Sequence, residues 1–207
     1  MPEFDRYAFF ALAAIVVSLI RYGTYFITIY KGQTKPHAFS WALWGVMTGI
    51  AAYAQFKLGG GPSVWALFFV AATCTLIAIL SLFIGEKNYT RLDWLALVGA
   101  LMAIPVWQMT NEPLAALLML MVIDALSYTP TIRKTYAKPD TEPPISCFWA
   151  GFRYFLVLFS VPDATWQTLI YPFFLMASDW GVAILIVVRR WQLGMPLHEY
   201  AKPKHIA

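Results

Sequence analysis

The chain has 207 residues, of which 60% are hydrophobic and 13% are charged, and its mean hydropathy is +0.61. A soluble domain would be nearer half apolar and a quarter charged, so this composition excludes an ordinary soluble protein and indicates an integral membrane protein. The formal net charge is +4, but the basic residues lie in short segments between apolar runs, which argues against a nucleic-acid-binding surface.

Seven apolar segments follow one another along the chain. A backbone in lipid has to satisfy its own hydrogen bonds, and about 20 mostly apolar residues cross the hydrocarbon as a helix, so each segment is predicted to span the membrane. The first segment has no obvious small-residue cleavage site, and we expect it to remain in the mature chain. The predicted spans are residues 7–30, 38–58, 64–84, 94–109, 114–132, 144–161 and 167–188.

An internal repeat connects the two ends of this series. Residues 21–36 return in degenerate form as residues 124–139, with six identities in sixteen positions at an offset of 103. At an offset of 105, Trp44 coincides with Trp149. Fixed-period similarity of this kind predicts two copies of one structural unit. The six identical pairs are Tyr25 and Tyr128, Thr28 and Thr131, Ile29 and Ile132, Lys31 and Lys134, Lys35 and Lys138, and Pro36 and Pro139.

The repeat divides the chain. Residues 1–84 form a first triple-helix unit, residues 85–113 contain a linker helix, residues 114–190 form the second unit, and residues 191–207 are a tail. Because a single helix separates the units, both have the same orientation. The predicted fold is therefore an all-α membrane protein of seven transmembrane helices, with two parallel triple-helix repeats joined by a linker helix. Such halves usually enclose a site at their interface near the bilayer midplane.

Basic residues in the connections indicate the orientation in the membrane, because Lys and Arg accumulate in cytoplasmic loops. One side has Arg6 and Lys57, whereas the other has eleven basic residues. This asymmetry predicts a multi-pass protein with its N-terminus outside and its C-terminal tail in the cytoplasm. The eleven residues are Lys31, Lys35, Lys87, Arg91, Arg133, Lys134, Lys138, Arg189, Arg190, Lys202 and Lys204.

The arrangement of three, one and three helices, the orientation, and the repeated core Thr-Ile-x-Lys-x-x-x-Lys-Pro resemble the PQ-loop and SWEET superfamily of membrane transporters. The core occupies residues 28–36 and 131–139. The resemblance implies transport by alternating access, with helices one and five bending near a proline. Pro130 stands at that place in the second unit and is the predicted hinge.

Two departures from the superfamily pattern bear on function. The Pro-Gln pair that names the group is absent, since the two copies read Ile27-Thr28 and Pro130-Thr131. Similar sugar transporters carry an asparagine on the third helix of each unit, where this chain offers Cys74 and Asp179. The resemblance therefore does not specify a sugar as the substrate.

Four ionisable residues lie within predicted spans: Arg21, Asp124, Arg153 and Asp179. A charge at the centre of a membrane helix costs about 2.5 to 3.5 kcal/mol on insertion scales, so such residues usually face a partner or a water-filled cavity. The repeat makes Arg21 and Asp124 equivalent, which predicts that they approach each other. Arg153 is then the candidate partner of Asp179.

Two interpretations of these charges stay open. In the first, they line a central cavity in which Asp124 or Asp179 binds a proton or another cation and an arginine meets an anionic part of a substrate. In the second, they form two structural ion pairs that fix the register of the halves.

Aromatic and polar side chains supply further candidates for the site. Trp44, Trp149 and Trp180 lie on helices that border the predicted interface, where aromatic walls would suit a ring-shaped or planar ligand. Packing in the core or against lipid is the alternative for each of them. Tyr128 is a polar candidate in the second unit, and Tyr53, Gln55 and Ser178 have weaker claims.

The predicted function is transport of a small polar metabolite, such as a sugar, an amino acid or a related compound, at a midplane site. Proton coupling through Asp124 or Asp179 is a secondary hypothesis. The alternatives are a non-transporting membrane scaffold or assembly factor, and a ligand receptor on the same fold. The expected partners are the lipid bilayer and the substrate, and association between copies of the chain is left open.

No enzymatic activity, cofactor or metal site is predicted. The three histidines, His37, His198 and His205, all lie outside the predicted spans. Cys74 and Cys147 fall at different depths, which argues against a disulfide or a metal pair. The chain also lacks a visible nucleophile with an adjacent base and a glycine-rich phosphate loop.

Overall fold

The computed structural model describes residues 5–30, 36, 38–85, 91–139 and 144–196. Within these ranges the regular secondary structure is helical and contains no strand, so the prediction of an all-α chain is confirmed. The helices are α1 (Arg6–Tyr30), α2 (Ala38–Lys57), α3 (Ser63–Ile84), α4 (Arg91–Thr110), α5 (Pro113–Ala137), α6 (Pro144–Phe159) and α7 (Trp166–Gln192).

Helices α5 and α7 are longer than the apolar segments that predicted them. Their last residues are Ala137 and Gln192, whereas the predicted spans end at residues 132 and 188. An apolar window stops at the first charged residues, but a helix continues through them because basic side chains near its C-terminus interact favourably with the helix dipole.

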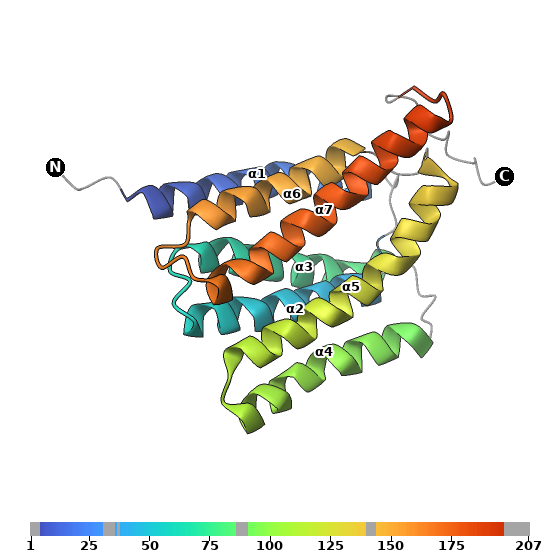
Figure 1. Ribbon diagram of the computed structural model, residues 1–207. Coiled ribbons are helices and arrows are strands. Elements are labelled where there is room, and N and C mark those ends of the chain that lie inside the picture. The colour runs from blue at the N-terminus through green and yellow to red at the C-terminus, as the bar shows by residue number, and fades with distance from the viewer. Residues whose placement is uncertain (1–4, 31–35, 37, 86–90, 140–143, 197–207) are drawn as a thin grey trace.

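Successive helices run in opposite directions, so the molecule has two distinct ends (Figure 1). The turn end contains the short connections 58–62, 111–112 and 160–165. The opposite end, here named the basic end, contains the last residues of α1, α3, α5 and α7 and the described residues Arg91, Lys138, Arg189 and Arg190. Lys31, Lys35 and the tail beyond residue 196 belong to predicted features that lie outside the described residues.

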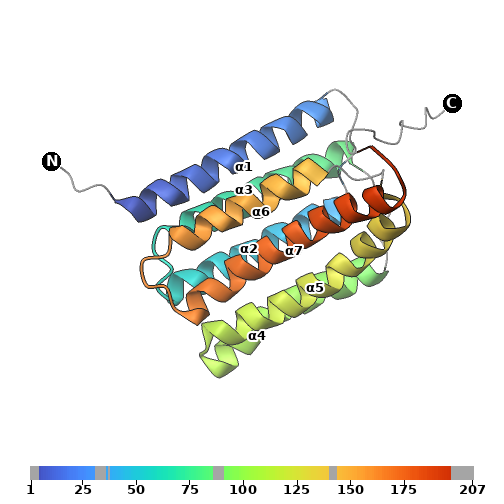
Figure 2. The same ribbon diagram turned by 45° about the horizontal axis from the view of Figure 1, so that its top comes forward.

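The helices pack in a regular order (Figures 1 and 2). Helix α3 packs against both α1 and α2, and α7 packs against both α5 and α6. The first three helices meet the last three chiefly through α1 with α6 and α2 with α5. Helix α4 packs on α2 and α5, at the edge of the molecule.

Three helical segments of the described chain are long and apolar enough to cross a membrane: Arg6–Ile27, Ser63–Ile84 and Trp166–Gln192. Shorter apolar helices accompany them, at Leu97–Thr110, Pro113–Leu126 and Pro144–Phe159. Large apolar side chains are also exposed along the outside of the molecule, as on α1, where Phe9, Leu12, Val16, Leu19 and Ile20 are each more than half exposed. These features suggest a protein embedded in a membrane.

Two contacts at the basic end involve the prolines of the repeated motif. Pro36 and Pro139 are both buried. The Pro36 carbonyl oxygen lies directly against Gly85, the residue that caps α3, and leaves no room for a side chain there. At Pro139, Arg190 at the end of α7 donates from Nε to the proline carbonyl oxygen at 2.9 Å. The two prolines therefore contact the ends of α3 and α7 respectively.

Helices α6 and α7 approach each other closely where Trp180 lies over Gly151. The Trp180 indole donates from Nε1 to the Phe148 carbonyl oxygen at 3.1 Å, and its ring is tilted against Phe155 at 5.7 Å between centroids. A Cβ atom at position 151 would overlap the indole ring. Glycine at this position therefore permits the contact.

Replacing Gly151 by alanine is expected to destabilise the protein by about 1 to 3 kcal/mol, because the added methyl group would displace a packed tryptophan. Chemical unfolding in mixed micelles measures this change. Gly181→Ala is the matched control, since no atom lies within 4 Å of the added methyl group. Equal stability of the two variants would contradict the described α6–α7 contact.

Candidate functional site

Arg153 on α6 is the centre of a buried polar cluster. Its side chain is 6% exposed. Nη1 donates to the Tyr22 hydroxyl on α1 at 2.9 Å, and Nη2 donates to the Tyr154 hydroxyl at 2.9 Å. Its remaining nitrogen, Nε, has no hydrogen-bond acceptor among the described residues. The arginine is thus held by neutral hydroxyl groups rather than by a carboxylate.

Tyr22 connects this arginine to two other groups. Its hydroxyl lies 3.8 Å from the Cys74 thiol on α3, within the range of a hydrogen bond to sulfur. The guanidinium carbons of Arg21 and Arg153 lie 5.7 and 5.6 Å from the centroid of its ring. One tyrosine ring therefore attracts two cations through its π-system.

Asp179 on α7 is the carboxylate that interacts electrostatically with the arginines. Its Oδ1 accepts a hydrogen bond of 3.0 Å from the Tyr128 hydroxyl on α5. The charges of Arg21 and Arg153 both act on it. Among the described residues, Asp179 thus interacts electrostatically with Arg21 as well as with Arg153, its predicted partner.

Asp124 on α5 is 6% exposed and interacts electrostatically with Asp179. Its carboxylate has no hydrogen-bond donor among the described residues. Tyr128, one helical turn further along, and Tyr171 on α7 both lie within its electrostatic influence. The predicted pairing of Asp124 with Arg21 is not among the contacts of the described residues.

The cluster has a clear polarity of charge. The arginines come from α1 and α6, which pack together, and the aspartates come from α5 and α7, which also pack together. Arg21, Asp124, Arg153, Asp179 and Tyr128 are thus brought into one region. Within that region, the cationic groups come from α1 and α6 and the acidic groups come from α5 and α7.

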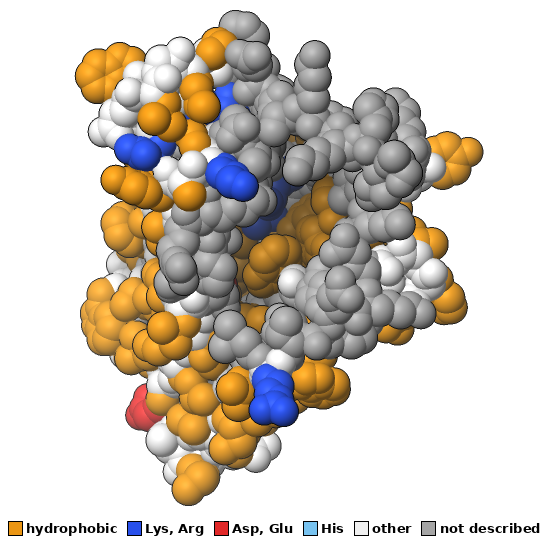
Figure 3. Space-filling model, turned by 90° about the vertical axis from the view of Figure 1, so that its right-hand side faces the viewer, with side chains coloured by type: hydrophobic (Ala, Val, Ile, Leu, Met, Phe, Trp, Pro, Cys, Tyr) orange, Lys and Arg blue, Asp and Glu red, His pale blue; other side chains and the backbone are white. Residues whose placement is uncertain are grey.

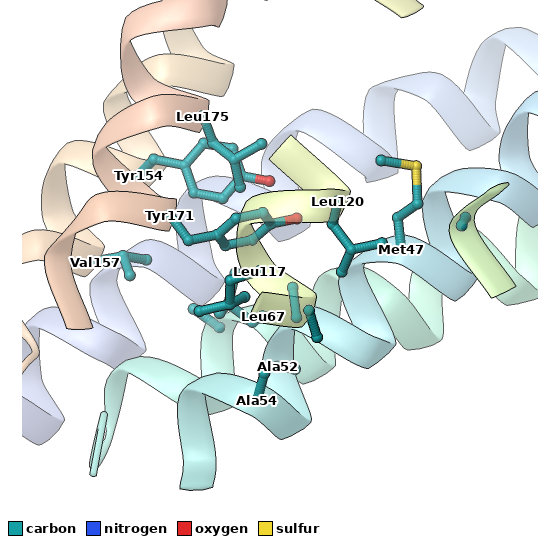
Figure 4. Close-up of a cluster of buried hydrophobic side chains, with 14 of the residues drawn as sticks. Met47, Ala52, Ala54, Leu67, Leu117, Leu120, Tyr154, Val157, Tyr171 and Leu175 are labelled. Atoms are coloured by element: carbon teal, nitrogen blue, oxygen red, sulfur yellow. The ribbon is translucent and has the colours of Figure 1, made fainter. Parts of the chain in front are cut away.

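A dry core lies beside the cluster toward the turn end (Figure 4). Tyr154 and Tyr171 are 4% and 1% exposed, and their rings lie near each other with both hydroxyl groups pointing in the same direction. Leu117, Leu120 and Leu175 are buried in the same cluster. This packing excludes water from one side of the polar groups.

Contacts between the two sets of three helices close the turn end. The Gln55 side-chain amide on α2 donates to the Thr168 carbonyl oxygen on α7. Phe10 on α1 packs on Phe159 of α6, with 5.3 Å between ring centroids. A Cβ atom at Gly61 would lie 3.9 Å from Cβ of Pro162, so the α2–α3 turn touches the α6–α7 connection.

The described side chains at the basic end can be followed in a view from that side (Figure 3). Figure 3 shows this end hollowed near its centre, and apolar and basic side chains are visible inside the hollow. Arg21 is partly exposed and lies nine residues before the end of α1 at Tyr30, about 13 Å at the helical rise per residue. The described molecule is therefore closed at one end and hollowed at the other.

The three predicted tryptophans contact other aromatic side chains. Trp44 and Trp149 are each 43% exposed and contact other aromatic rings, Trp41 for the first and Phe148 and Phe152 for the second. Trp180 packs between α6 and α7 as described above. The backbone of α5 remains helical through Pro130, and nothing is described of that proline's side chain.

Two grooves lie on the outside of the bundle. One, of about 420 Å³, runs between α5 and α7 and is lined by Tyr128 and by small residues such as Ala125 and Gly181. The other, of about 480 Å³, lies between α2 and α4 and includes Tyr53 and Trp107, whose rings are 5.2 Å apart. Among the described residues there is no group of three or more His, Cys, Asp or Glu side chains that could hold a metal ion.

Four members of the cluster were not predicted as site residues: Tyr22, Cys74, Tyr154 and Tyr171. Tyr22 and Tyr154 each follow an intramembrane arginine directly in the sequence. The tyrosine that directly follows each arginine could have been predicted as a site residue, because a buried guanidinium needs hydrogen-bond acceptors. Cys74 and Tyr171 carry no such local signal.

Comparison with known proteins adds no relative: no family model, no curated protein and no solved structure matches this chain.

Tyr22→Phe is expected to lower the free energy of unfolding by about 1.5 to 3 kcal/mol, because it removes an acceptor from a buried charged donor. Chemical unfolding in mixed micelles tests this expectation. Tyr30→Phe makes the same change on the same helix at a side chain that is 93% exposed, and it should have little effect. A loss no greater than that of Tyr30→Phe would argue against the Tyr22–Arg153 hydrogen bond.

Proposed function

We propose that the protein is a membrane transporter that moves a small polar metabolite by alternating access between two halves. The observation that carries this proposal is the cluster of Arg21, Asp124, Arg153 and Asp179 where the first three helices meet the last three. Charged side chains inside a membrane protein are costly and commonly mark a pathway for ions or solutes.

The packing pattern supports two parallel triple-helix repeats, residues 1–84 and 114–190, joined by a linker helix within residues 85–113. Exchanging the two units turns the α1–α6 contact into the α5–α2 contact, and both are observed. The contacts of the two prolines also correspond: Pro36 and Pro139 are 103 positions apart, and Gly85 and Arg190 are 105 apart, as in the sequence repeat. In this proposal all seven helices span the membrane, as in the PQ-loop and SWEET superfamily.

The distribution of basic residues supports an orientation with the N-terminus outside and the C-terminus in the cytoplasm. The basic end would then face the cytoplasm, and the hollow in Figure 3 would be the entrance to an inward-facing state. A solute that entered there would meet Arg21 before the more deeply buried Arg153.

The closed turn end supplies the second requirement of alternating access, a barrier that can open. The Gln55–Thr168 hydrogen bond and the Gly61–Pro162 contact each join one half to the other. An outward-facing state would break these contacts and close the basic end. The ribbon of α5 curves toward its C-terminal end (Figure 1), in the part of the helix that contains Pro130, and this curvature supports Pro130 as the hinge.

The charges are also arranged in a way that favours transport over a purely structural role. Two structural ion pairs would place each carboxylate against one arginine. Instead, Arg153 is hydrogen-bonded to tyrosines, and Asp124 faces another carboxylate. If the protein transports no solute, the scaffold interpretation is favoured. If it binds a ligand without moving it across the membrane, the receptor interpretation is favoured.

Locking the turn end tests the transport proposal. In the double variant Gly61→Cys and Pro162→Cys, a Cβ atom added at position 61 would lie 3.9 Å from the Cβ atom of position 162, which suits a disulfide. The cysteine at position 61 would have to adopt the φ of +56° that glycine has there, so folding of the reduced variant is checked first by its unfolding transition. Proteoliposomes are screened for uptake of labelled sugars, amino acids and organic acids. Oxidation should abolish uptake by the double variant, and reduction should restore it.

The control for this experiment is the unmodified chain, whose two cysteines, Cys74 and Cys147, form no disulfide, treated with the same oxidant. Uptake that continues while the disulfide is demonstrably formed would contradict alternating access at the turn end. The absence of uptake of every labelled compound by the reduced protein would favour a scaffold or a receptor.

Proton coupling through the acidic side of the cluster gives a second test. Two carboxylates buried near each other are stabilised by a shared proton or another bound cation, because it offsets their mutual repulsion. Asp124→Asn and Asp179→Asn should therefore each abolish uptake driven by a pH gradient, while exchange of labelled for unlabelled substrate persists in at least one variant. Coupling is refuted if uptake is independent of the pH gradient and survives both replacements.

A further inference from the structure

The Arg153 guanidinium has N–H donors that its two hydroxyl partners do not use. The group has five N–H donors, and two hydroxyl groups occupy one on each terminal nitrogen. Three N–H donors remain, Nε–H and one on each terminal nitrogen. Nε–H and a neighbouring terminal N–H are the kind of donors that bind a carboxylate in a bidentate manner.

Nε is buried and has no acceptor among the described residues. A donor left in this condition costs roughly 1 to 3 kcal/mol, and more when it belongs to a charged group. Its neighbours Tyr22 and Tyr154 bring no negative charge. An incoming anion would therefore supply the missing hydrogen bond at Nε.

Arg21 adds a second cation on the side from which a ligand would arrive. Its guanidinium carbon lies 5.7 Å from the centroid of the same Tyr22 ring, and its side chain is partly exposed. The aspartates lie across the cluster on α5 and α7, where they would repel an anion from their own side. The electrostatic field therefore orients a ligand with its negative group toward α1 and α6.

We propose that the site binds its ligand through a carboxylate group, held by the Nε edge of Arg153 with Arg21 as the second cation. A ligand bound in this way would be a substrate only if the proposed transport function holds, and its carboxylate then names the substrate class. The carboxylate belongs either to a simple organic acid or to a zwitterion whose ammonium group faces Asp124 and Asp179.

Three probes of similar shape separate these chemistries: sodium propionate, its neutral isostere propionamide, and L-alanine, which carries the same carboxylate beside an ammonium group. Each is titrated to tens of millimolar into the purified full-length protein at constant ionic strength, because ligands this small bind weakly. Thermal shift reports binding, since a ligand of the folded state raises the midpoint of unfolding.

Propionate is expected to raise the unfolding midpoint, and propionamide is not. Arg153→Gln and Arg21→Gln should each weaken propionate binding by about ten- to a hundredfold, the loss expected for one charge-assisted hydrogen bond. Arg6→Gln makes the same change at an exposed arginine on α1 and should leave binding unchanged. Binding of L-alanine at least as strong as that of propionate would identify a zwitterion, and binding of propionate alone would identify a simple acid.

A second measurement does not depend on whether Arg153→Gln folds. In protein labelled with [¹⁵N]arginine, the Nε–H signal of Arg153, assigned by its loss in Arg153→Lys, should move on addition of propionate and not of propionamide. A signal unmoved by both carboxylates, or equal thermal shifts with propionate and propionamide, would overturn the proposal.

Uptake in proteoliposomes separates this inference from the transport proposal. Carboxylate binding at Arg153 without uptake of any bound compound would keep the site and refute transport. Uptake of a neutral solute without carboxylate binding would keep transport and refute the carboxylate site.

Discussion

The arrangement of side chains in the middle of this molecule depends on the burial of one positive charge, that of Arg153. The Arg153 guanidinium lies away from water, and its hydrogen bonds go to hydroxyl groups on α1 and α6 rather than to a carboxylate. A buried guanidinium needs several acceptors in defined positions, and the hydrogen bond to Tyr22 is the one that joins α6 to α1, since Tyr154 lies on α6 itself. The acidic groups on α5 and α7 then balance the charge without a hydrogen bond to the guanidinium, and Nε of Arg153 is left without an acceptor among the described residues.

The two ends of the bundle differ in a way that follows from the residues there. Small and apolar groups meet at the turn end, where Gly61 lies against Pro162 and Phe10 against Phe159. At the opposite end, α7 has Arg189 and Arg190 in its last turn and α4 begins at Arg91, and these like charges repel one another and favour water. The polar cluster lies between a dry core on one side and a hollow on the other.

The helices were predictable from the sequence because their apolar segments are long and their separating turns are rich in glycine, proline and charge. The gathering of Arg21, Asp124, Arg153 and Asp179 was predictable as well, because charged side chains within apolar helices usually face the interior of the bundle, where they meet one another. Their partners were not predictable. Equivalence in a repeat fixes which helices correspond, but which side chains touch depends on helix rotation and on tyrosines such as Tyr171, whose role appears only in three dimensions. Trp44 and Trp149 illustrate the converse, since a residue on an interface-bordering helix can face outward.

The packing order has a consequence for biosynthesis. Helix α1 finds one principal neighbour in α3 and the other in α6, so its contacts are incomplete until most of the chain has been made. Arg21 leaves the ribosome about 160 residues before Asp179, the acidic residue on which its charge acts. At about 5 to 20 residues per second, that interval is roughly 8 to 30 seconds. During it, the first helix carries an uncompensated charge, and its retention in the membrane depends on the insertion machinery or on lipid headgroups rather than on the finished fold.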